Sequence, residues 1–359
     1  MLGWDSYPLG FLEMFRFSEE EKRKYARQGH PDIAAFHHDL YRGCAKNGRW
    51  SVLEQQPGPV NWARHNPAPL PGMVRLWTLE AFAHGAELVS YFRWRQFPKA
   101  QEQMHAGLLR PDAAPAPALA EARAAADDLA RIGDPGEAPK QAALVFAYDA
   151  EWMTQIQPQG EGRSALWAAF AAYSSLRRLG LNVDIVSPSA SLDGYALVIV
   201  PCLPIVPDEL VAKLAGSEAQ VVIGPRTGTR DLDFAIPDAL LHEGLAEFIG
   251  GRVVRSESLS ARLVMAGDGW EARGWLDHYE GEAMPEMVAN GGEVVALRHG
   301  RAWIAAAWPQ GSFLDTLVQR AANAAGLEAE PLPEGIRRRR RGDTLFEFDY
   351  NAGEVRFER

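Results

Sequence analysis

The amino-acid sequence predicts an α/β protein with three successive parts, and three observations support this. Short apolar strands alternate with helices over residues 140–328, which favours a mainly parallel, doubly wound sheet of the flavodoxin-like type. Before it, residues 1–112 show a strand, a helix and a second strand at the spacing of a βα barrel or an open parallel sheet. After it, residues 329–359 alternate in polarity, as a small β module does.

The first part is expected to contain two helices and two strands. Apolar side chains recur at helical spacing over 32–46 and over 73–84, and the runs 50–55 and 88–92 are predicted strands. Because parallel strands joined by helices end at the same edge, functional side chains would gather where these strands end.

A linker and one helix are expected over residues 113–139. Two Ala-Pro steps within 111–117 favour extended backbone, as in a linker. Residues 118–132 contain neither Pro nor Gly and carry apolar side chains on one side, which predicts an amphipathic helix. The Gly- and Pro-rich stretch 133–136 ends it.

The doubly wound part is defined by strands and helices that follow one another in order. The expected strands are 142–146, 183–186, 197–200 and 220–224, and the expected helices are 164–179 and 207–214. Strand 197–200 is purely apolar, so we expect both of its faces to be covered. No Gly-rich loop follows strand 142–146, which argues against nucleotide binding.

Composition and charge exclude several classes of protein. Hydrophobic residues make up 47% and charged residues 23%, as in a globular rather than a disordered chain. The formal net charge of -10 disfavours nucleic acid as a partner, and no apolar run approaches the length of a membrane span. Cys44 and Cys202 lie far apart, so we expect no disulfide framework, a reducing compartment and a cytoplasmic location.

Three local patterns allow more than one interpretation. The five arginines at 337–341 predict a solvated strand edge, with phosphate or nucleic-acid binding as the alternative. His37 and His38 could suggest a metal site, but neighbouring helical residues point to different faces. Cys202 could serve an amidotransferase-like activity, yet it lacks a Gly-rich nucleophile turn, and a buried small thiol explains it.

A carboxylate and an aromatic residue follow the predicted strand 50–55. Glu54 lies at its end, and a Pro/Gly turn leads on to Trp62. This is the layout of a sugar-cleaving site on a barrel rim, in which Glu54 could act as a nucleophile. The alternative is a capping or ion-paired carboxylate near Arg64 or Arg75.

The next predicted strand leads into a second group of such side chains, namely Trp94, Glu102 and His105. Indole faces stack on the C–H surfaces of a pyranose, while a carboxylate and an imidazole hold its hydroxyl groups. This combination suits a sugar ligand. Taken alone, a histidine such as His105 is more often a hydrogen-bond donor within a loop than a catalytic group.

Longer motifs in the same part closely resemble the β-galactosidases of glycoside hydrolase family 42. They are WDSYP (4–8), FHHDLY (36–41), EQQPGPVNW (54–62), PGMVRLWT (71–78), SYFRWRQ (90–96) and AQEQMHAG (100–107). The resemblance implies a TIM barrel, a flavodoxin-like trimerisation domain and a small C-terminal β domain. It also implies a retaining enzyme that releases β-D-galactose from lactose-like and oligosaccharide substrates, with no cofactor.

The resemblance assigns roles to six residues. Glu54 is the implied nucleophile, on the seventh barrel strand. The implied substrate-binding residues are Trp62, Glu102 and His105, with Trp94 in the same rim motif and Tyr7, near the end of the sixth barrel strand, as a further candidate. No metal ligand is expected.

One departure from the family pattern is large. The family's acid/base glutamate precedes the WDSYP motif, which begins here at Trp4. We therefore expect that carboxylate and the first five barrel strands to lie outside this chain, and residues 329–359 to be a truncated C-terminal domain.

Three further expectations follow from this departure. The isolated chain should hydrolyse galactosides negligibly. It would then be a non-catalytic oligomerisation module or one fragment of a split β-galactosidase, completed by an upstream-encoded barrel fragment. In either case we expect a homotrimer formed through residues 140–328.

Overall fold

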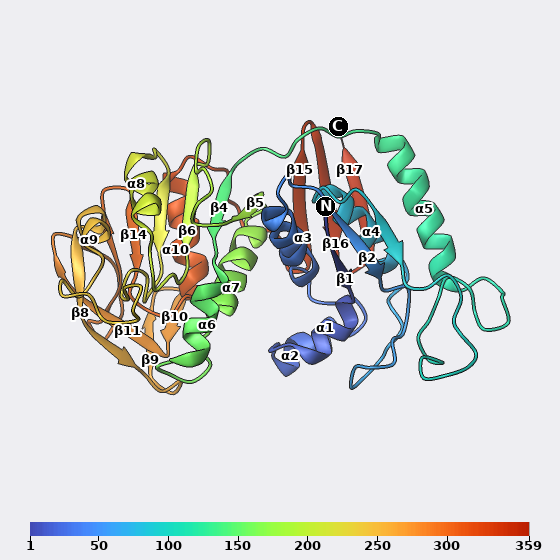
Figure 1. Cartoon of the computed structure of the whole chain (residues 1–359), viewed down its shortest axis with the longest axis horizontal. Coiled ribbons are helices and arrows are strands. Elements are labelled where there is room, and N and C mark those ends of the chain that lie inside the picture. Colours follow the sequence, from blue (N-terminus) through green and yellow to red (C-terminus); the bar gives the residue numbers. More distant parts are fainter. Residues whose placement is uncertain (359) are drawn as a thin grey trace. The chain divides into compact units, whose positions relative to one another are not determined.

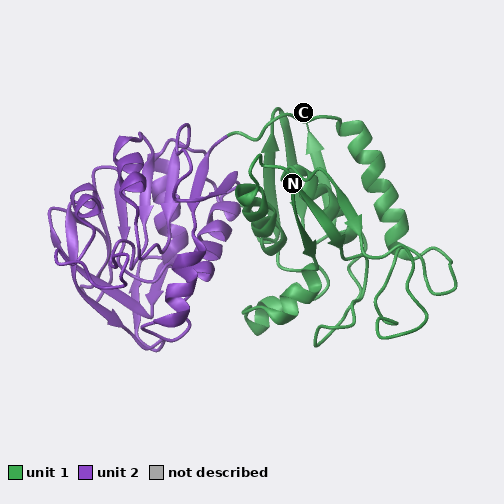
Figure 2. Ribbon diagram, viewed as in Figure 1, with its two compact units in different colours: residues 1–139, 332–359 green, residues 140–331 purple. Residues whose placement is uncertain are grey.

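The computed structural model describes residues 1–358 and divides the chain into two compact units (Figure 2). Unit 1 comprises residues 1–139 and the C-terminal stretch from Leu332, and unit 2 comprises residues 140–331. The sequence set the C-terminal stretch apart as a domain of its own. In the structure its apolar face, including Phe346 and Phe348, belongs to the core of unit 1.

Unit 1 is built on a parallel sheet whose three strands are ordered β1-β2-β3 (Figure 1). The strands are β1 (Leu2–Ser6), β2 (Trp50–Gln55) and β3 (Val89–Tyr91). The helices between them are α1 (Pro8–Met14), α2 (Glu19–Lys24), α3 (Ile33–Cys44) and α4 (Met73–Ala83). Because all three strands run the same way, their carboxyl ends share one edge.

The remaining elements of unit 1 cover α4. They are α5 (Pro117–Ile132) and the antiparallel strands β15 (Ile336–Arg341), β16 (Thr344–Asp349) and β17 (Glu354–Glu358). Gly72 starts α4 at φ +92°, a conformation that favours glycine. The carboxylate of Glu121 on α5 accepts the amides of Gly72 (2.9 Å) and Val74 (2.8 Å), which satisfies donors that a helix start leaves unpaired.

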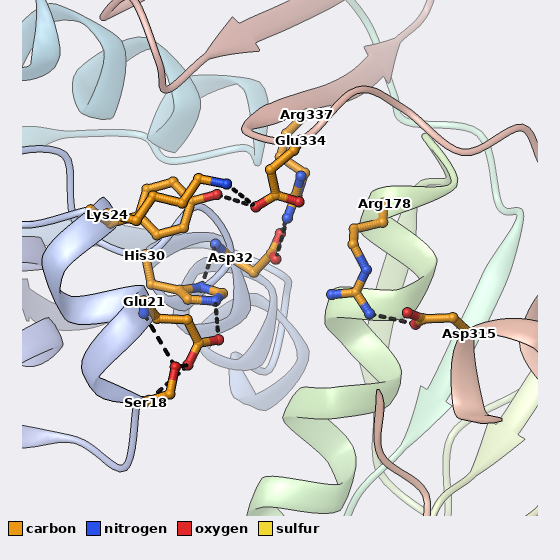
Figure 3. Close-up of polar contacts among 10 residues, drawn as sticks. Ser18, Glu21, Lys24, His30, Asp32, Arg178, Asp315, Glu334 and Arg337 are labelled. Carbon is orange, nitrogen blue, oxygen red and sulfur yellow. Dashed lines mark hydrogen bonds and ion pairs between the residues drawn. The ribbon is translucent and has the colours of Figure 1, made fainter. Parts of the chain in front are cut away.

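The arginine run 337–341 lies on an edge strand with Arg340 exposed, but the expectation of a solvated edge is wrong for two of its five residues. Strand alternation directs Arg337 and Arg339 inward, where they are 3% and 1% exposed. Arg337 donates from Nε and Nη2 to both oxygens of Asp32, at 2.6 and 2.8 Å (Figure 3). Burial alone would raise the pKa of Asp39, but Arg339 and other nearby cations outweigh it and hold that pKa well below its usual range.

A second polar contact ties the C-terminal stretch to α2. The hydroxyl of Tyr25 donates to Glu334 at 2.5 Å, and Lys24 pairs with the same carboxylate at 3.0 Å (Figure 3). The helix itself begins with a capping box, in which Ser18 and Glu21 each accept the other's backbone amide.

Unit 2 contains a seven-stranded sheet in the order β12-β13-β14-β7-β6-β4-β5. The strands are β4 (Ala142–Val145), β5 (Val183–Val186), β6 (Leu197–Val200), β7 (Gln220–Ile223), β12 (Met284–Val288), β13 (Val294–His299) and β14 (Ala302–Ala305). Strands β4 to β7 and β14 pair in parallel, while β12 and β13 add an antiparallel edge. The first four strands match the predicted ones.

Helices cover both faces of this sheet. They are α6 (Tyr148–Ile156), α7 (Ala165–Arg178), α8 (Asp208–Gly216), α9 (Glu243–Ile249) and α10 (Gly311–Ala324). Figure 1 shows α7 and α10 on one side and α9 on the other, and β6 is buried throughout, as its apolar sequence predicts. Arg178 on α7 pairs with Asp315 on α10 (Figure 3).

Two antiparallel pairs complete unit 2: β8 (Gly251–Ser258) with β11 (Trp275–Gly281), and β9 (Val264–Gly267) with β10 (Trp270–Arg273). No helix within residues 1–358 is long and apolar enough to cross a membrane.

We expect Arg337→Met to lower the free energy of unfolding of unit 1 by about 3–5 kcal/mol, because it leaves the carboxylate of Asp32 buried without its partner. Arg356→Met is the matched control, since Arg356 is exposed and pairs with Glu354 only at 3.4 Å. It should cost less than about 1 kcal/mol. Urea unfolding of both variants measures the two losses in free energy of unfolding. Equal losses would contradict a stabilising role of the buried pair of Arg337 with Asp32.

Candidate active site

The carboxyl ends of the three parallel strands bring the predicted site residues of unit 1 together. Strand pairing sets Asp5 of β1 beside Glu54 of β2, and Gln55 of β2 beside Tyr91 of β3. Tyr7 follows β1 directly and precedes α1. Parallel pairing therefore places residues far apart in sequence at one edge, as the strand-end argument predicts.

The central contact of the site joins Tyr7 and Glu54. The tyrosine hydroxyl donates to Oε2 of Glu54 at 2.5 Å, and Tyr7 is buried. Burial, together with this hydrogen bond and the glutamate charge, raises the pKa of Tyr7 far above its ordinary value. The phenol therefore keeps its proton at neutral pH and holds one carboxylate oxygen in place, leaving the other for a ligand.

Neither of the two alternative partners for Glu54 is paired with it: Arg64 is exposed, and Arg75 is engaged elsewhere. Arg75 pairs instead with Asp128 of α5, with Nε donating to Oδ2 at 2.5 Å. On the neighbouring strand, burial first and then the charge of Glu54 raise the pKa of Asp5. Two carboxyl groups thus lie side by side on β1 and β2.

An exposed indole forms one side of the site. Trp62 is 41% exposed and meets the ring of Tyr7 edge to face, with centroids 5.4 Å apart. A Cβ atom at Gly10 would lie 2.2 Å from Cη2 of Trp62, so only glycine lets the indole lie where it does. Trp62 therefore has one fixed edge and one face open to solvent.

His105 lies behind this edge with unused hydrogen-bonding capacity. It is 2% exposed, packs edge to face on Tyr7 and Phe92, and neither ring nitrogen has a hydrogen-bond partner. Burial and the nearby charge of Arg93 lower its pKa, although Glu54 opposes this. At neutral pH the imidazole is uncharged and can both donate and accept a hydrogen bond.

Glu102 and Trp94 lie on the loop beyond β3. Glu102 is held by an ion pair with Arg93, while Trp94 leaves 63% of its surface in solvent. Trp94 is thus the predicted site residue most open to solvent.

Two residues that shape the site were not predicted from the sequence. Arg93 holds Glu102 and faces His105, and it could have been noticed inside the SYFRWRQ motif. Gln56 uses its side-chain amide to accept the amide of Leu9 (3.1 Å) and to donate to the carbonyl of Gly58 (2.9 Å). It thereby ties the start of α1 to the turn after β2, and the available signal was a glutamine directly after a predicted strand.

The other patterns of the sequence do not form sites. No group of three His, Cys, Asp or Glu side chains in residues 1–358 could hold a metal ion. Cys202 is buried, and burial raises the pKa of its thiol to about 12. Such a thiol is almost entirely protonated at neutral pH, which removes the chemical basis of an amidotransferase-like activity.

Comparison with known proteins identifies the class to which this fold and site belong. The family profile described as "Beta-galactosidase" matches residues 1–132, and that of the "Beta-galactosidase trimerisation domain" matches residues 140–328. The β-galactosidase of Thermus thermophilus is 50% identical over 98% of this chain and 55% of its own length. That of Halorubrum lacusprofundi is 32% identical over 99% of this chain and 55% of its own length.

A solved structure agrees with these relatives. The crystal structure of the β-galactosidase from the psychrophilic Marinomonas ef1 has a TM-score of 0.90 at 42% identity, over 97% of this chain and 55% of that one. The chain belongs to the β-galactosidase family, glycoside hydrolase family 42. It spans about 55% of the length of the relatives that it matches.

We expect His105→Leu to leave the free energy of unfolding unchanged or to raise it by about 1–2 kcal/mol, because it removes two buried polar atoms that have no partner. His84→Leu is the control, since His84 is equally buried but bonded to Asp39 at 3.0 Å. It should cost about 1–3 kcal/mol. Urea unfolding of both variants decides, and a loss above about 2 kcal/mol for His105→Leu would show a structural role.

Proposed function

We propose that this chain carries the nucleophile half of a retaining β-galactosidase site, which removes terminal non-reducing β-D-galactose. The observation that carries the proposal is the Glu54 carboxylate at the end of the middle strand, held by the Tyr7 hydroxyl at 2.5 Å in a member of this family. A carboxylate fixed through one oxygen presents the other for attack on an anomeric carbon.

In the proposed reaction Glu54 attacks the sugar and forms a glycosyl-enzyme, which water then hydrolyses. Tyr7 holds the attacking carboxylate before the bond forms and donates its hydrogen bond again when the carboxylate leaves. Because its raised pKa keeps the phenol protonated, this donor is available at neutral pH. Tyr7 would therefore both line the sugar site and position the nucleophile Glu54.

The sugar would be held by the side chains around this carboxylate. Trp62 offers an indole face to the C–H surface of galactose, and His105 offers two ring nitrogens without partners to its hydroxyl groups. Glu102, held in place by its ion pair with Arg93, would accept hydrogen bonds from these hydroxyl groups. Trp94, which is more exposed, would contact the sugar that leaves.

A retaining site needs a second carboxyl group about 5–5.5 Å from the nucleophile to protonate the departing oxygen. The carboxylates that the described residues place around Glu54 suit that role poorly. Asp5 lies beside it on the adjacent strand, and Glu102 is paired with Arg93. We propose that the acid/base glutamate comes from polypeptide other than residues 1–359, and that this chain alone hydrolyses galactosides negligibly.

A partial TIM barrel is the fold that accompanies this proposal. Only three parallel strands form the sheet of unit 1 in the described residues, and Leu53 on its central strand is 50% exposed. Further barrel strands would cover that side chain and supply hydrogen bonds to the edges of β1 and β3. We therefore propose that residues 1–112 form the C-terminal part of a barrel and that residues 113–139 are a linker and helix. The stretch from Leu332 would be the start of a further β domain.

The second candidate function is assembly without catalysis, which the match to a trimerisation domain over 140–328 favours. The order β5-β4-β6-β7-β14 corresponds to the 2-1-3-4-5 order of flavodoxin-like sheets, which supports that class for unit 2. The chain would then be a homotrimeric module or one part of a split β-galactosidase. A cytoplasmic location stays a prediction.

Complementation tests the catalytic proposal. We expect no turnover of nitrophenyl-β-galactoside by the purified chain, and turnover after mixing with the part of the Thermus thermophilus β-galactosidase that lies outside the match, or with an upstream-encoded fragment. Glu54→Gln should then reduce the rate by at least about 10³-fold, because it removes the nucleophile.

Glu87→Gln is the control for that experiment. Glu87 precedes β3 at the opposite edge of the sheet and is ion-paired with Arg49, so its substitution should not affect the rate. Efficient hydrolysis by the chain alone would overturn the half-site, and activity that survives Glu54→Gln would overturn the assigned nucleophile.

Light scattering tests assembly separately. At about 10 µM the chain should have a mass near three times 39.5 kDa, whether or not it hydrolyses anything. A monomer under these conditions would contradict the homotrimer.

A further inference from the structure

A cavity within unit 2 lies at the end of β7, far in sequence from the residues around Glu54. It measures about 430 Å³, and the loop 224–230 contributes Arg226, Thr229 and Arg230 to its lining. This loop has the sequence GPRTGTR and leaves the carboxyl end of a parallel strand. Ligands of open α/β sheets bind beyond the carboxyl ends of the strands.

Arg226 is the unusual residue of this cavity. It is 3% exposed, and of its side-chain nitrogens only Nη2 donates a hydrogen bond, to the carbonyl of Gln157 at 3.1 Å. Its Nε and Nη1 atoms are buried without a hydrogen-bond partner. A buried guanidinium with unpaired donors is costly to the folded state, and an acceptor that enters the cavity would remove that cost.

The backbone at Arg226 is also held in an unfavourable conformation. Its φ is +66°, in the region that favours glycine. The glycines of this loop stand at other positions, 224 and 228, so the strained position is occupied by an arginine. The hydroxyl of Thr229 fixes the turn by donating to the carbonyl of Arg226 at 2.7 Å. Such conformations persist where the surrounding structure imposes them, which is frequent at ligand sites.

The charges around the cavity leave an excess of positive charge. Three arginines line it, Arg226, Arg230 and Arg255, and no carboxylate is among the described lining residues. Behind the lining, Asp277 faces Arg226, and Glu257 pairs with Arg255 at 3.3 Å. Two carboxylates against three guanidinium groups leave one positive charge, in a chain whose net charge is -10.

The carboxylate of Asp277 is already engaged on one side. Its Oδ1 accepts from Ser256 at 2.6 Å and from the Trp275 indole at 2.8 Å. Its Oδ2 is buried without a hydrogen-bond partner, as are Nε and Nη1 of Arg226, so Asp277 balances charge near Arg226 but accepts no hydrogen bond from these two donors.

We propose that this cavity binds the oxyanion of a small solute, a phosphate or a carboxylate group, through Arg226 and Arg230. Guanidinium groups match the geometry of both kinds of oxyanion. Ile236 and Leu240, which also line the cavity, would contact the less polar part of the solute. The volume suits a small molecule, and the negative charge of the chain disfavours nucleic acid.

Titration calorimetry of the full chain at pH 7 tests the site, with inorganic phosphate and acetate as separate probes and ionic strength held constant with chloride. We expect saturable binding of at least one probe to the unsubstituted chain. Binding of phosphate identifies a phosphorylated solute, and binding of acetate identifies a carboxylated one. Binding of neither would overturn the proposal.

Three variants separate the site from general anion binding. Arg230→Gln and Arg226→Lys should each weaken binding about tenfold or more, the first by loss of charge and the second by loss of the planar fork. Arg262→Gln, at an exposed arginine outside the lining, should leave binding unchanged. Equal affinity of the Arg230→Gln and Arg262→Gln chains would refute the site even if Arg226→Lys fails to fold.

Discussion

The parallel pairing of β1 with β2 is the constraint on which the site depends. It fixes Asp5 beside Glu54 and sends the chain after β1 directly past that carboxylate, so that the first residue beyond the strand, Tyr7, bonds to it. A slip of one residue would turn Glu54 to the other face of the sheet. Gln56 opposes such a slip, because its side chain ties the residues after β2 to the start of α1.

Local signals in the sequence predicted many of the elements well. The helix expected over 73–84 is α4 (Met73–Ala83), and the strand expected over 50–55 is β2 (Trp50–Gln55). The strands between 251 and 305 were missed because their polarity alternates weakly, although most of them pair with the next strand along the chain. The pairing of Arg337 with Asp32 was missed for a different reason, since a run of arginines carries no mark of the buried acid that it meets.

The gathering of the candidate residues at the strand ends was predictable from the sequence. An acid that closes a strand, followed by a turn and an indole, sufficed to select Glu54 and Trp62. What the sequence could not provide is which polar groups meet. Glu102 is paired with Arg93, and His105 is buried without a hydrogen-bond partner for its ring, because both conditions depend on how the loop after β3 folds back.

The division of the chain into units imposes an order on its synthesis. Unit 1 is interrupted after residue 139 and resumes at Leu332, so a ribosome must make the whole of unit 2 before the last strands of unit 1 exist. At 5–20 residues per second this takes roughly 10–40 s. During that interval the surface of α4 and α5 that later receives Phe346 and Phe348 stays uncovered in the nascent chain. Unit 2, which is continuous in sequence, can fold first, and residues 1–139 of unit 1 are the part of the newborn chain that waits for its last strands.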